Sequence, residues 1–368
     1  MSSTTITFDP ARALPAGSYR DRAWMDIEIE RIWRNDWVFV ATEDKLQSPG
    51  DQLPIDVGGQ PVLLLRDQRG ELRALSNLCA HRGTLLVDKP TNEKRIQCPY
   101  HAWTYDDSGQ LLIVPFQKED VIDKSKHCLP TYRVESWHGL IFVSLNSEVE
   151  AMSSRLKTIE PYVAAFGIDE LRHRTDLESK EEWQCNWKIA IMNAMESYHL
   201  FKVHPDSLEP YTPTKDSYYI AGSARSSVTG GTYMKSNDYR LFSIPPGFVG
   251  VLTEGSLLWL ATYPTGLHSC QIRTGSALAK TQHRSTLRDI GEWLTDTIEA
   301  TAIPDFLPED KEICERVQRG MIGDFEPGQL LSVERVVRDF NHYYNWRLNG
   351  VEPPPVHRER AFEEVRSK

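Results

Sequence analysis

The chain has 368 residues, of which 40% are hydrophobic and 26% are charged, and its formal net charge is −10. These values are ordinary for a soluble globular protein, and the lysines and arginines, scattered among acids, give no basic footprint for nucleic acid. No apolar run approaches the roughly 18 residues of a membrane span, and the N-terminus lacks the basic and apolar regions of a signal peptide. We therefore expect a cytoplasmic protein that binds neither nucleic acid nor a membrane.

The first part of the chain predicts a helix followed by a small β domain. Over residues 18–34, apolar side chains follow the spacing of a buried helical stripe, at Met25, Ile29, Ile32 and Trp33. Short β-rich runs separated by Gly, Pro, Asp and Asn then predict antiparallel strands, at 36–41, 61–66, 71–77 and 139–145.

Helical patterns return beyond residue 150 and predict a second, mixed region. Strand-like runs occupy about 216–280, and candidate helices lie at 150–166, 186–203, 285–303 and 308–321. This arrangement predicts an α+β domain whose antiparallel sheet is packed by helices.

Two cysteines and two histidines form a pair of short motifs in the β domain. They are Cys79-x-His81 and, sixteen residues later, Cys98-x-x-His101. Thiolate and imidazole ligands suit zinc or an iron–sulfur cluster. A structural zinc site usually pairs Cys with Cys and His with His, whereas each loop here supplies one of each. That order favours a [2Fe–2S] cluster with two Cys on one iron and two His on the other, and a zinc ribbon is the alternative.

A second group of candidate ligands lies in the stretch 183–205. His199 and His204 are five residues apart, which is about 140° of rotation on an ideal helix. Pro205 disfavours the α region at His204, so His204 can lie past the helix end and turn back toward His199. Glu196 precedes His199 by three residues and shares its face. The alternative is an ordinary surface helix with a Glu–His pair, because short motifs also match by chance.

A third ligand is sought in PEDKEICERVQRGM at 308–321. Pro308 suits the first turn of a helix, where acids also complement the helix dipole. Asp310 lies on the apolar stripe of this helix, and a buried acid needs a partner, which a metal ion would supply. We therefore favour Asp310 as the ligand, with Glu309 as the alternative. The stripe consists of Ile313, Cys314, Val317 and Met321.

Both motifs resemble those of the Rieske non-heme iron oxygenases. CAHRG at 79–83 and CPYHAWTYDDSGQL at 98–111 are similar to their cluster loops, and 186–205 is similar to their acid-x2-His-x4-His motif. The resemblance covers nearly the whole chain and implies an oxygenase (alpha) subunit. It implies a [2Fe–2S] Rieske cluster and a mononuclear Fe(II). The implied cluster ligands are Cys79, His81, Cys98 and His101, and the implied iron ligands are His199, His204 and Asp310.

The same resemblance implies an α+β architecture in three parts. Residues 1–38 would form an N-terminal helical segment packed on the catalytic domain. Residues 39–148 would form the Rieske β domain. Residues 149–368 would form a helix-grip (START-like) catalytic domain with a central antiparallel sheet.

The resemblance also implies partners and further site residues. Electrons would come from an NAD(P)H-dependent flavin and iron–sulfur reductase, or a ferredoxin, and would be used with O2 on a small substrate. Family members work as homotrimers, with the cluster of one subunit beside the iron of the next. Glu196 would then be the electron-transfer bridge, contacting His199 and facing His101 of a neighbouring chain. Asn193 is expected to contact the substrate.

The substrate class is predicted from departures within the family. Ring-hydroxylating members usually have Asp where this chain has Glu196, and Glu is similar to the carnitine and quaternary-ammonium oxygenases. We therefore expect a monooxygenase that hydroxylates or N-demethylates a quaternary ammonium compound, methylated amine or betaine. Aromatic faces can bind such cations, although aromatic residues are also common in cores. The candidates are Tyr211, Tyr218, Tyr219, Tyr233 and Trp259.

Two alternatives to this substrate prediction are kept. ERVVRDF at 334–340 departs from the Glu-His-Gly pattern of the carnitine enzymes. An aromatic-ring dioxygenase, or an O-demethylase acting on an aromatic acid, is therefore the first alternative. A Rieske electron carrier or scaffold without oxygenase activity is the second, against which the intact His199, His204 and Asp310 argue.

Overall fold

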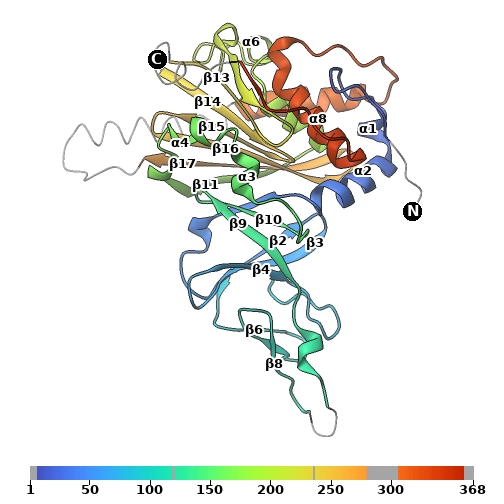
Figure 1. Ribbon diagram of the computed structural model, residues 1–368, viewed down its shortest axis with the longest axis vertical. Helices are drawn as coiled ribbons and strands as arrows, with labels where there is room; N and C mark the ends of the chain where they lie inside the picture. The colour runs from blue at the N-terminus through green and yellow to red at the C-terminus, as the bar shows by residue number, and fades with distance from the viewer. Residues whose placement is uncertain (1–5, 118–120, 235–236, 280–305, 360–368) are drawn as a thin grey trace, which may run out of the picture. The chain divides into compact units, whose positions relative to one another are not determined.

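The computed structural model describes residues 6–117, 121–234, 237–279 and 306–359 (Figure 1). The helix predicted near 285–303 lies outside these residues. The chain divides into two compact units, one made of Met1–Glu28 with Ser153–Lys368 and the other of Ile29–Met152. The predicted boundaries at 38/39 and 148/149 stay predictions. In the described part of the chain, no helix combines the length and hydropathy needed to cross a membrane.

The unit of residues 29–152 is a β structure, as the sequence predicts. Its strands pair antiparallel in a seven-stranded sheet of order β1-β10-β9-β4-β3-β2-β5 and a three-stranded sheet β6-β7-β8. The predicted strands correspond to β1, β3, β4 and β10. The strands are β1 (Val38–Thr42), β2 (Asp51–Val57), β3 (Gln60–Arg66), β4 (Leu72–Ser76), β5 (Thr91–Asn92), β6 (Ile96–Gln97), β7 (Thr104–Tyr105), β8 (Leu111–Ile113), β9 (Thr131–Trp137) and β10 (Leu140–Ser144).

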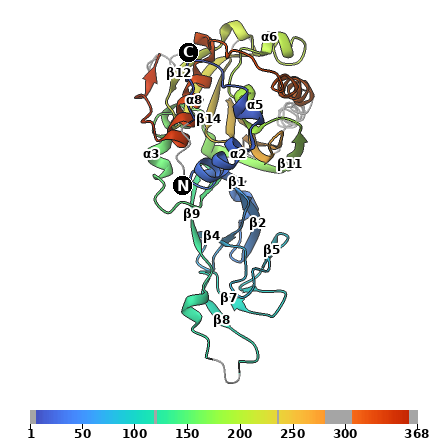
Figure 2. The ribbon, with the colours of Figure 1, turned by 90° about the vertical axis from the view of Figure 1, so that its right-hand side faces the viewer.

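The other unit is built on an eight-stranded antiparallel sheet of order β11-β17-β16-β15-β14-β13-β12-β18. Figure 2 shows helices α5 and α8 beside its strands. The strands are β11 (Leu171–Trp183), β12 (Tyr218–Gly222), β13 (Ser227–Tyr233), β14 (Asn237–Ile244), β15 (Phe248–Thr253), β16 (Ser256–Gly266), β17 (Ser269–Ala279) and β18 (His357–Arg358). The helices are α1 (Gly17–Arg20), α2 (Arg22–Glu28), α3 (Met152–Leu156), α4 (Glu160–Ala164), α5 (Trp187–Ala194), α6 (Leu200–Val203), α8 (Arg335–Asn349) and a helix described over 306–320.

One face of this sheet carries both C-terminal helices. Asp339 of α8 accepts a hydrogen bond from Ser227 of β13 at 2.9 Å. When the directly paired residues are followed from strand to strand, starting at Ser227, they end at Thr274 of β17. Lys311 of the 306–320 helix pairs at 3.4 Å with Glu181 of β11. Glu181 lies directly opposite the residue of β17 that is two positions before Thr274. Since alternate residues of a strand share a face, α8 and the 306–320 helix cover the same side. This confirms the predicted helix-grip arrangement.

Two predicted helices are interrupted for a local reason. The helix predicted over 18–34 is divided into α1, α2 and a π-helical turn at Ile29–Trp33, and Asp21 accepts a hydrogen bond from the backbone of Ala23 at the first break. The helix predicted over 186–203 is divided into α5 and α6. In the gap, the Glu196 carboxylate accepts hydrogen bonds from the backbone N–H groups of Tyr198 and His199. Such side-chain acceptors compete with helical bonding and start a new turn.

A buried ion pair joins α2 to α5 within the sheet unit. Glu28, the last residue of α2, and Lys188 of α5 are both fully buried, with Glu28 Oε1 and Lys188 Nζ 2.7 Å apart. Trp187 Nε1 donates to Glu28 Oε2 at 2.7 Å, and the Tyr344 hydroxyl also donates to Glu28. Lys188 Nζ donates to Asn186 Oδ1 at 2.7 Å. The pair is therefore completely desolvated and hydrogen-bonded on both sides.

Replacing Glu28 by Ala is expected to destabilise the fold by about 3–5 kcal/mol, because removing one partner leaves a buried charge uncompensated. The loss should appear as a lower urea midpoint in equilibrium unfolding. The matched control is Asp26→Asn on the same helix, which breaks an exposed pair with Arg22 and should cost less than about 1 kcal/mol. Equal losses in the two variants would show that the buried pair is not a stability determinant.

Candidate functional site

The first candidate site is formed by two adjacent loops of the β unit. Cys79 and His81 follow β4, and Cys98 and His101 lie between β6 and β7. Each loop is closed by a backbone bond to its own cysteine carbonyl, from Gly83 at 2.9 Å and from Ala102 at 3.0 Å. The two thiols are buried, and the rings of His81 and His101 lie 4.8 Å apart between centroids. The fold thus brings all four predicted ligands together.

The environment of these four residues fits a two-iron cluster. The buried Nδ1 of His101 has no hydrogen-bond partner among the residues that the structure describes, which leaves it available as a ligand. The Tyr105 hydroxyl lies 3.3 Å from Cys79 Sγ, so it can donate to a sulfur ligand. The His81 ring stacks on Trp103 with centroids 4.6 Å apart. Two buried thiols with two imidazoles outside them match a Cys2His2 cluster.

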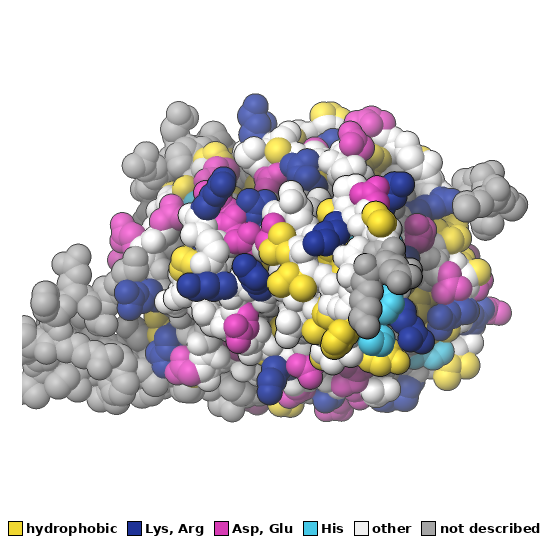
Figure 3. All heavy atoms as spheres, turned by 90° about the horizontal axis from the view of Figure 1, so that it is seen from below, with side chains coloured by type: hydrophobic (Ala, Val, Ile, Leu, Met, Phe, Trp, Pro, Cys, Tyr) yellow, Lys and Arg dark blue, Asp and Glu magenta, His cyan; other side chains and the backbone are white. Residues whose placement is uncertain are grey.

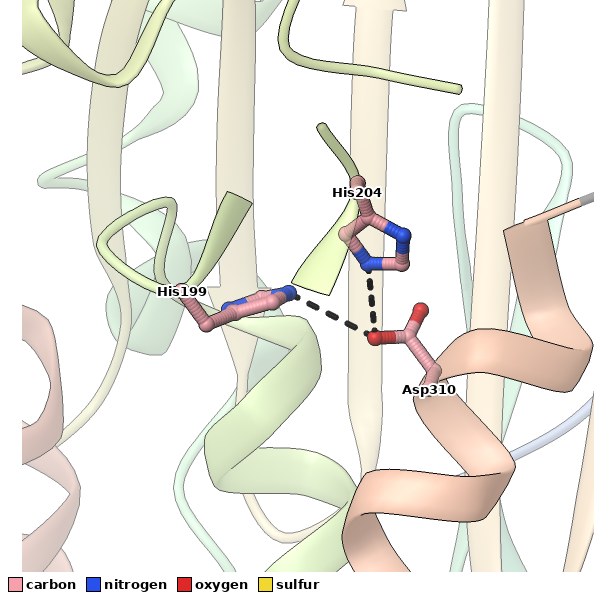
Figure 4. A group of neighbouring side chains, drawn as sticks. All are labelled: His199, His204 and Asp310. Atoms are coloured by element: carbon pink, nitrogen blue, oxygen red, sulfur yellow. Dashed lines mark hydrogen bonds and ion pairs between the residues drawn. The ribbon is translucent and has the colours of Figure 1, made fainter. Parts of the chain in front are cut away.

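The second candidate site lies on the helix-covered side of the sheet unit. His199 immediately precedes α6, His204 immediately follows it, and Asp310 lies on the 306–320 helix. Asp310 Oδ1 is 3.4 Å from His199 Nε2 and 3.0 Å from His204 Nε2. Figure 4 shows both rings pointing at this one carboxylate oxygen. Among the described residues, this is the one group of three or more potential ligands whose atoms lie close enough together to hold a single metal ion, all within 4.8 Å.

The charges of this site are arranged to attract a cation. Burial alone lowers the pKa of His199, but hydrogen bonds to Asp310 and Glu196 outweigh burial and raise that pKa to about 9. Burial raises the pKa of Asp310, but hydrogen bonds to His199 and His204 outweigh it and lower that pKa to about 2. A proton on an imidazole thus balances the carboxylates where no metal ion is bound. A divalent cation binds by displacing such protons from its ligands.

Carboxylates hold the outer nitrogens of both histidines. Glu196 Oε1 is 2.6 Å from His199 Nδ1, and Glu309 Oε2 is 2.7 Å from His204 Nδ1. Ser207 Oγ donates to Glu309 Oε2 at 2.5 Å. An acceptor on Nδ1 fixes the proton there and directs Nε2 to a metal.

The structure places three further residues beside the proposed ligands. Glu309, the alternative ligand, lies on the outer side of His204, away from the converging Nε2 atoms, and Asp310 occupies the inner position. Asn193, expected to contact substrate, donates to Asp310 Oδ1 at 2.7 Å, and its substrate role stays a prediction. Ser207 was missed, because no pattern links it to a residue 102 positions away.

Two of the candidate cation-binding aromatic residues have structural contacts instead. Trp259 lies opposite Gly250 and Gly275, on the other sheet face from Leu260 and Thr274. A Cβ at Gly275 would come within 2.3 Å of the Trp259 ring, so this ring fills the space above the glycine. Tyr219 donates its hydroxyl to the buried Asp339 at 2.6 Å. Both side chains are buried, with 3% of Trp259 and 7% of Tyr219 exposed, and the Arg335 guanidinium lies 5.8 Å from the Tyr219 ring centroid.

The chain matches two known domain families. Residues 36–133 match the family described as Rieske [2Fe-2S] domain, and residues 168–350 match the ring hydroxylating alpha subunit (catalytic domain). The chain therefore belongs to the Rieske non-heme iron oxygenases, as an oxygenase (alpha) subunit. The two domains imply a Rieske [2Fe–2S] cluster and a mononuclear iron as cofactors.

Relatives with assigned activities fall into two substrate groups. The chain is 31% identical over 208 residues to a glycine betaine monooxygenase oxygenase subunit of Chromohalobacter salexigens, covering 55% of this chain and 46% of that one. It is 26% identical to a chlorobenzene dioxygenase subunit alpha of a Cupriavidus species, covering 79% and 72%. The chain thus spans about half the length of the glycine betaine relatives that it matches.

A solved structure of a quaternary ammonium Rieske monooxygenase has the same fold. Its TM-score is 0.78 at 21% identity, and the alignment covers 94% of this chain and 97% of that one. At this identity the likeness concerns the fold alone. It agrees with a Rieske domain and a helix-grip domain in one chain.

Proposed function

We propose that the protein is the oxygenase component of a Rieske non-heme iron system that oxidises a small substrate with O2. The observation that carries the proposal is the convergence of His199, His204 and Asp310 in a chain that also holds two cluster loops. A carrier of electrons alone would not need the second group. Two histidines and one carboxylate are the ligand set of non-heme Fe(II) oxygenases, which leave positions open for O2.

We assign Cys79, His81, Cys98 and His101 to the cluster, and His199, His204 and Asp310 to the Fe(II). When bound, the cluster supplies single electrons and the Fe(II) supplies the site at which O2 reacts with substrate. The surrounding residues hold this ligand set in place. Glu196 and Glu309 keep the protons of their histidines on Nδ1, so that both Nε2 atoms face the ion. The Asn193 amide fixes the Asp310 carboxylate.

Glu196 is also proposed as the electron bridge between subunits of a homotrimer. One carboxylate oxygen is bonded to His199, and the other accepts backbone bonds that hold the turn before α6. The side chain is 12% exposed, so a docked histidine could reach it. The related quaternary ammonium monooxygenase is described with inter-subunit electron transfer. By analogy, His101 of a neighbouring copy is the expected partner.

The surface around the cluster loops suits such docking. Tyr100 and Leu85, which flank the predicted ligands in sequence, are 58% and 43% exposed. Figure 3 shows a face on which histidine side chains reach the surface among hydrophobic and basic ones. A second copy of the chain, or the reductase or ferredoxin that supplies electrons, would cover this face. The cytoplasmic location stays a prediction.

For the substrate, we favour a quaternary ammonium compound, methylated amine or betaine, to be hydroxylated or N-demethylated. The similarity to glycine betaine monooxygenase supports this class. Hydroxylation of an aromatic ring is the second candidate, which the sheet face toward the 306–320 helix favours. Aliphatic side chains with partial exposure lie on that face, namely Val251, Leu258 and Leu260. The relation to chlorobenzene dioxygenase supports this candidate.

The test mixes the protein with its reductase and NAD(P)H, and measures O2 consumption together with the products formed. Betaines, methylated amines and aromatic acids are compared. We expect coupled consumption, with formaldehyde or a hydroxylated product, for one amine or betaine. Coupled turnover of aromatic substrates only would move the assignment to the second candidate. A loaded protein that reduces and reoxidises its cluster but turns over no member of the panel would favour a carrier.

Replacing Glu309 by Gln is expected to weaken Fe(II) binding at the mononuclear site by about 10- to 100-fold, the usual cost of losing an outer-shell acceptor. Glutamine keeps the size but loses the charge beside His204 Nδ1. The affinity is measured as the dissociation constant for Fe(II), determined in competition with a chelator. The control is Glu312→Gln, an exposed acid on the same helix, which should bind Fe(II) like wild type. Unchanged binding in the Glu309 variant would show that His204 needs no outer acceptor.

A further inference from the structure

Three of the six cysteines gather in the sheet unit, outside the proposed metal sites. Cys185 lies in the connection between β11 and α5, Cys270 near the start of β17, and Cys314 on the 306–320 helix. Their side chains are almost completely buried, with exposures of 0%, 0% and 1%. Cys185 Sγ and Cys270 Sγ are 3.8 Å apart, and Cys314 is a further hydrogen-bond partner of Cys185. No metal role in the proposed function uses them.

Buried cysteines often serve only as small hydrophobic residues, and this cluster differs in one respect. Cys185 is in contact with two other thiols, which can both donate to its sulfur. These hydrogen bonds lower the pKa of Cys185 although burial opposes the shift. A thiolate is the nucleophile in thiol oxidation, and here a second thiol already lies against it. The pair thus combines an attacking and a resolving sulfur.

The segment 184–186, which contains Cys185, is hydrogen-bonded to the helix that contains Asp310. The backbone N–H of Gln184 donates to Glu315 Oε1 at 3.0 Å, and that of Asn186 donates to Gln318 Oε1 at 2.8 Å. These two bonds flank Cys185 in sequence. Any shift of the 184–186 segment is therefore transmitted to the 306–320 helix.

We propose that Cys185 and Cys270 form a site of reversible oxidation, at which hydrogen peroxide converts the two thiols into a disulfide. The Cys185 thiolate attacks peroxide, the O–O bond breaks, and the products are a sulfenic acid and hydroxide. The Cys270 thiol then displaces water from the sulfenic sulfur and forms the S–S bond. Two thiols and one peroxide thus give one disulfide and two waters. A dithiol reductant reverses the change.

Oxidation should loosen the Asp310 helix, a consequence that rests on the proposed iron site. The sulfurs must approach from 3.8 Å to about 2.05 Å. Because the sheet holds Cys270 in its ladder, most of the movement falls on the 184–186 segment. Its bonds to Glu315 and Gln318 would lengthen, and the helix would hold Asp310 less firmly. We expect the oxidised protein to release its mononuclear iron to a chelator about tenfold faster, comparable to losing an outer-shell contact.

The experiment uses the protein with both metal centres in place. It is exposed to graded hydrogen peroxide, denatured in an alkylating reagent, digested and analysed for linked peptides by mass spectrometry. The cluster absorption is followed in parallel, because damage to the cluster would release Cys79 and Cys98. Three variants are compared with wild type, namely Cys185→Ser, Cys270→Ser and Cys128→Ser, the last removing an exposed thiol.

We expect a peptide link between residues 185 and 270 in wild type and Cys128→Ser, absent from the other two variants and reversed by dithiothreitol. If both thiols remain fully alkylated at peroxide levels that oxidise Cys128, the proposal is overturned. A dominant link between Cys185 and Cys314 would also contradict the chosen pair. Iron release is then compared between oxidised wild type and Cys185→Ser. A disulfide without faster release refutes only the coupling to Asp310, and a protein with no mononuclear iron before oxidation refutes the proposed function instead.

Discussion

Replacing Asp310 by Ala is expected to remove the mononuclear iron and to abolish substrate turnover, while the cluster spectrum remains. Asp310 Oδ1 is the atom on which His199 Nε2 and His204 Nε2 both converge. Without it, two neutral imidazoles would have to hold a divalent cation alone in a buried site. The cluster ligands belong to the other compact unit, so their iron should be unaffected. Metal analysis and electron paramagnetic resonance of the reduced protein measure the two centres separately.

Two further variants make this prediction specific. Glu312→Ala removes an exposed acid from the same helix and should keep both the iron and the activity. Glu309→Ala should weaken iron binding less than Asp310→Ala, because Glu309 contacts His204 through the outer nitrogen. If Asp310→Ala keeps its iron while Glu309→Ala loses it, the ligand assignment is wrong.

Glu196→Gln is expected to keep both metal centres and the oligomer but to lose electron delivery between them. Glutamine has the size of glutamate without its charge. A charge-assisted hydrogen bond to an imidazole N–H is about twice as strong as a neutral one, and the proposed bridge needs such bonds to two imidazoles. The measurement is a single turnover with a pre-reduced cluster, substrate and O2, in which cluster reoxidation is followed by absorbance. We expect reoxidation to be slower than in wild type by at least two orders of magnitude, roughly 3 kcal/mol or more in barrier.

Controls separate a bridge from a general charge effect. Asp206→Asn removes an exposed carboxylate two residues from His204 and should reoxidise at the wild-type rate. Glu196→Asp should be impaired, because the shorter side chain spans less of the gap. Reoxidation of the Glu196→Gln cluster at the wild-type rate would mean that electrons take another route.

The grouping of the proposed ligands could be predicted from the sequence, because most of them lie in short local patterns. Each cluster loop contains two of the proposed ligands, and His199 and His204 flank the short helix α6. The apolar stripe of the helix favours Asp310 over Glu309 as the ligand. Its position beside the two Nε2 atoms agrees with that preference.

Long-range partners could not be predicted, since periodicity carries no information about contacts between distant segments. The bonds of Asn193 to Asp310 and of Ser207 to Glu309 join residues 117 and 102 positions apart. The buried pair of Glu28 and Lys188 is separated by 160 positions. The break between α5 and α6 was missed because the Glu196 carboxylate binds backbone N–H groups there instead of facing solvent.

The most direct test of the central claim is the iron content of the purified protein, combined with its paramagnetic resonance spectrum after reduction. A [2Fe–2S] cluster with a mononuclear site predicts about three iron ions per chain and a Rieske-type signal from the cluster. Two irons per chain with this signal would indicate an electron carrier without an oxygenase site. A colourless protein with stoichiometric zinc and no such signal would contradict both proposed centres.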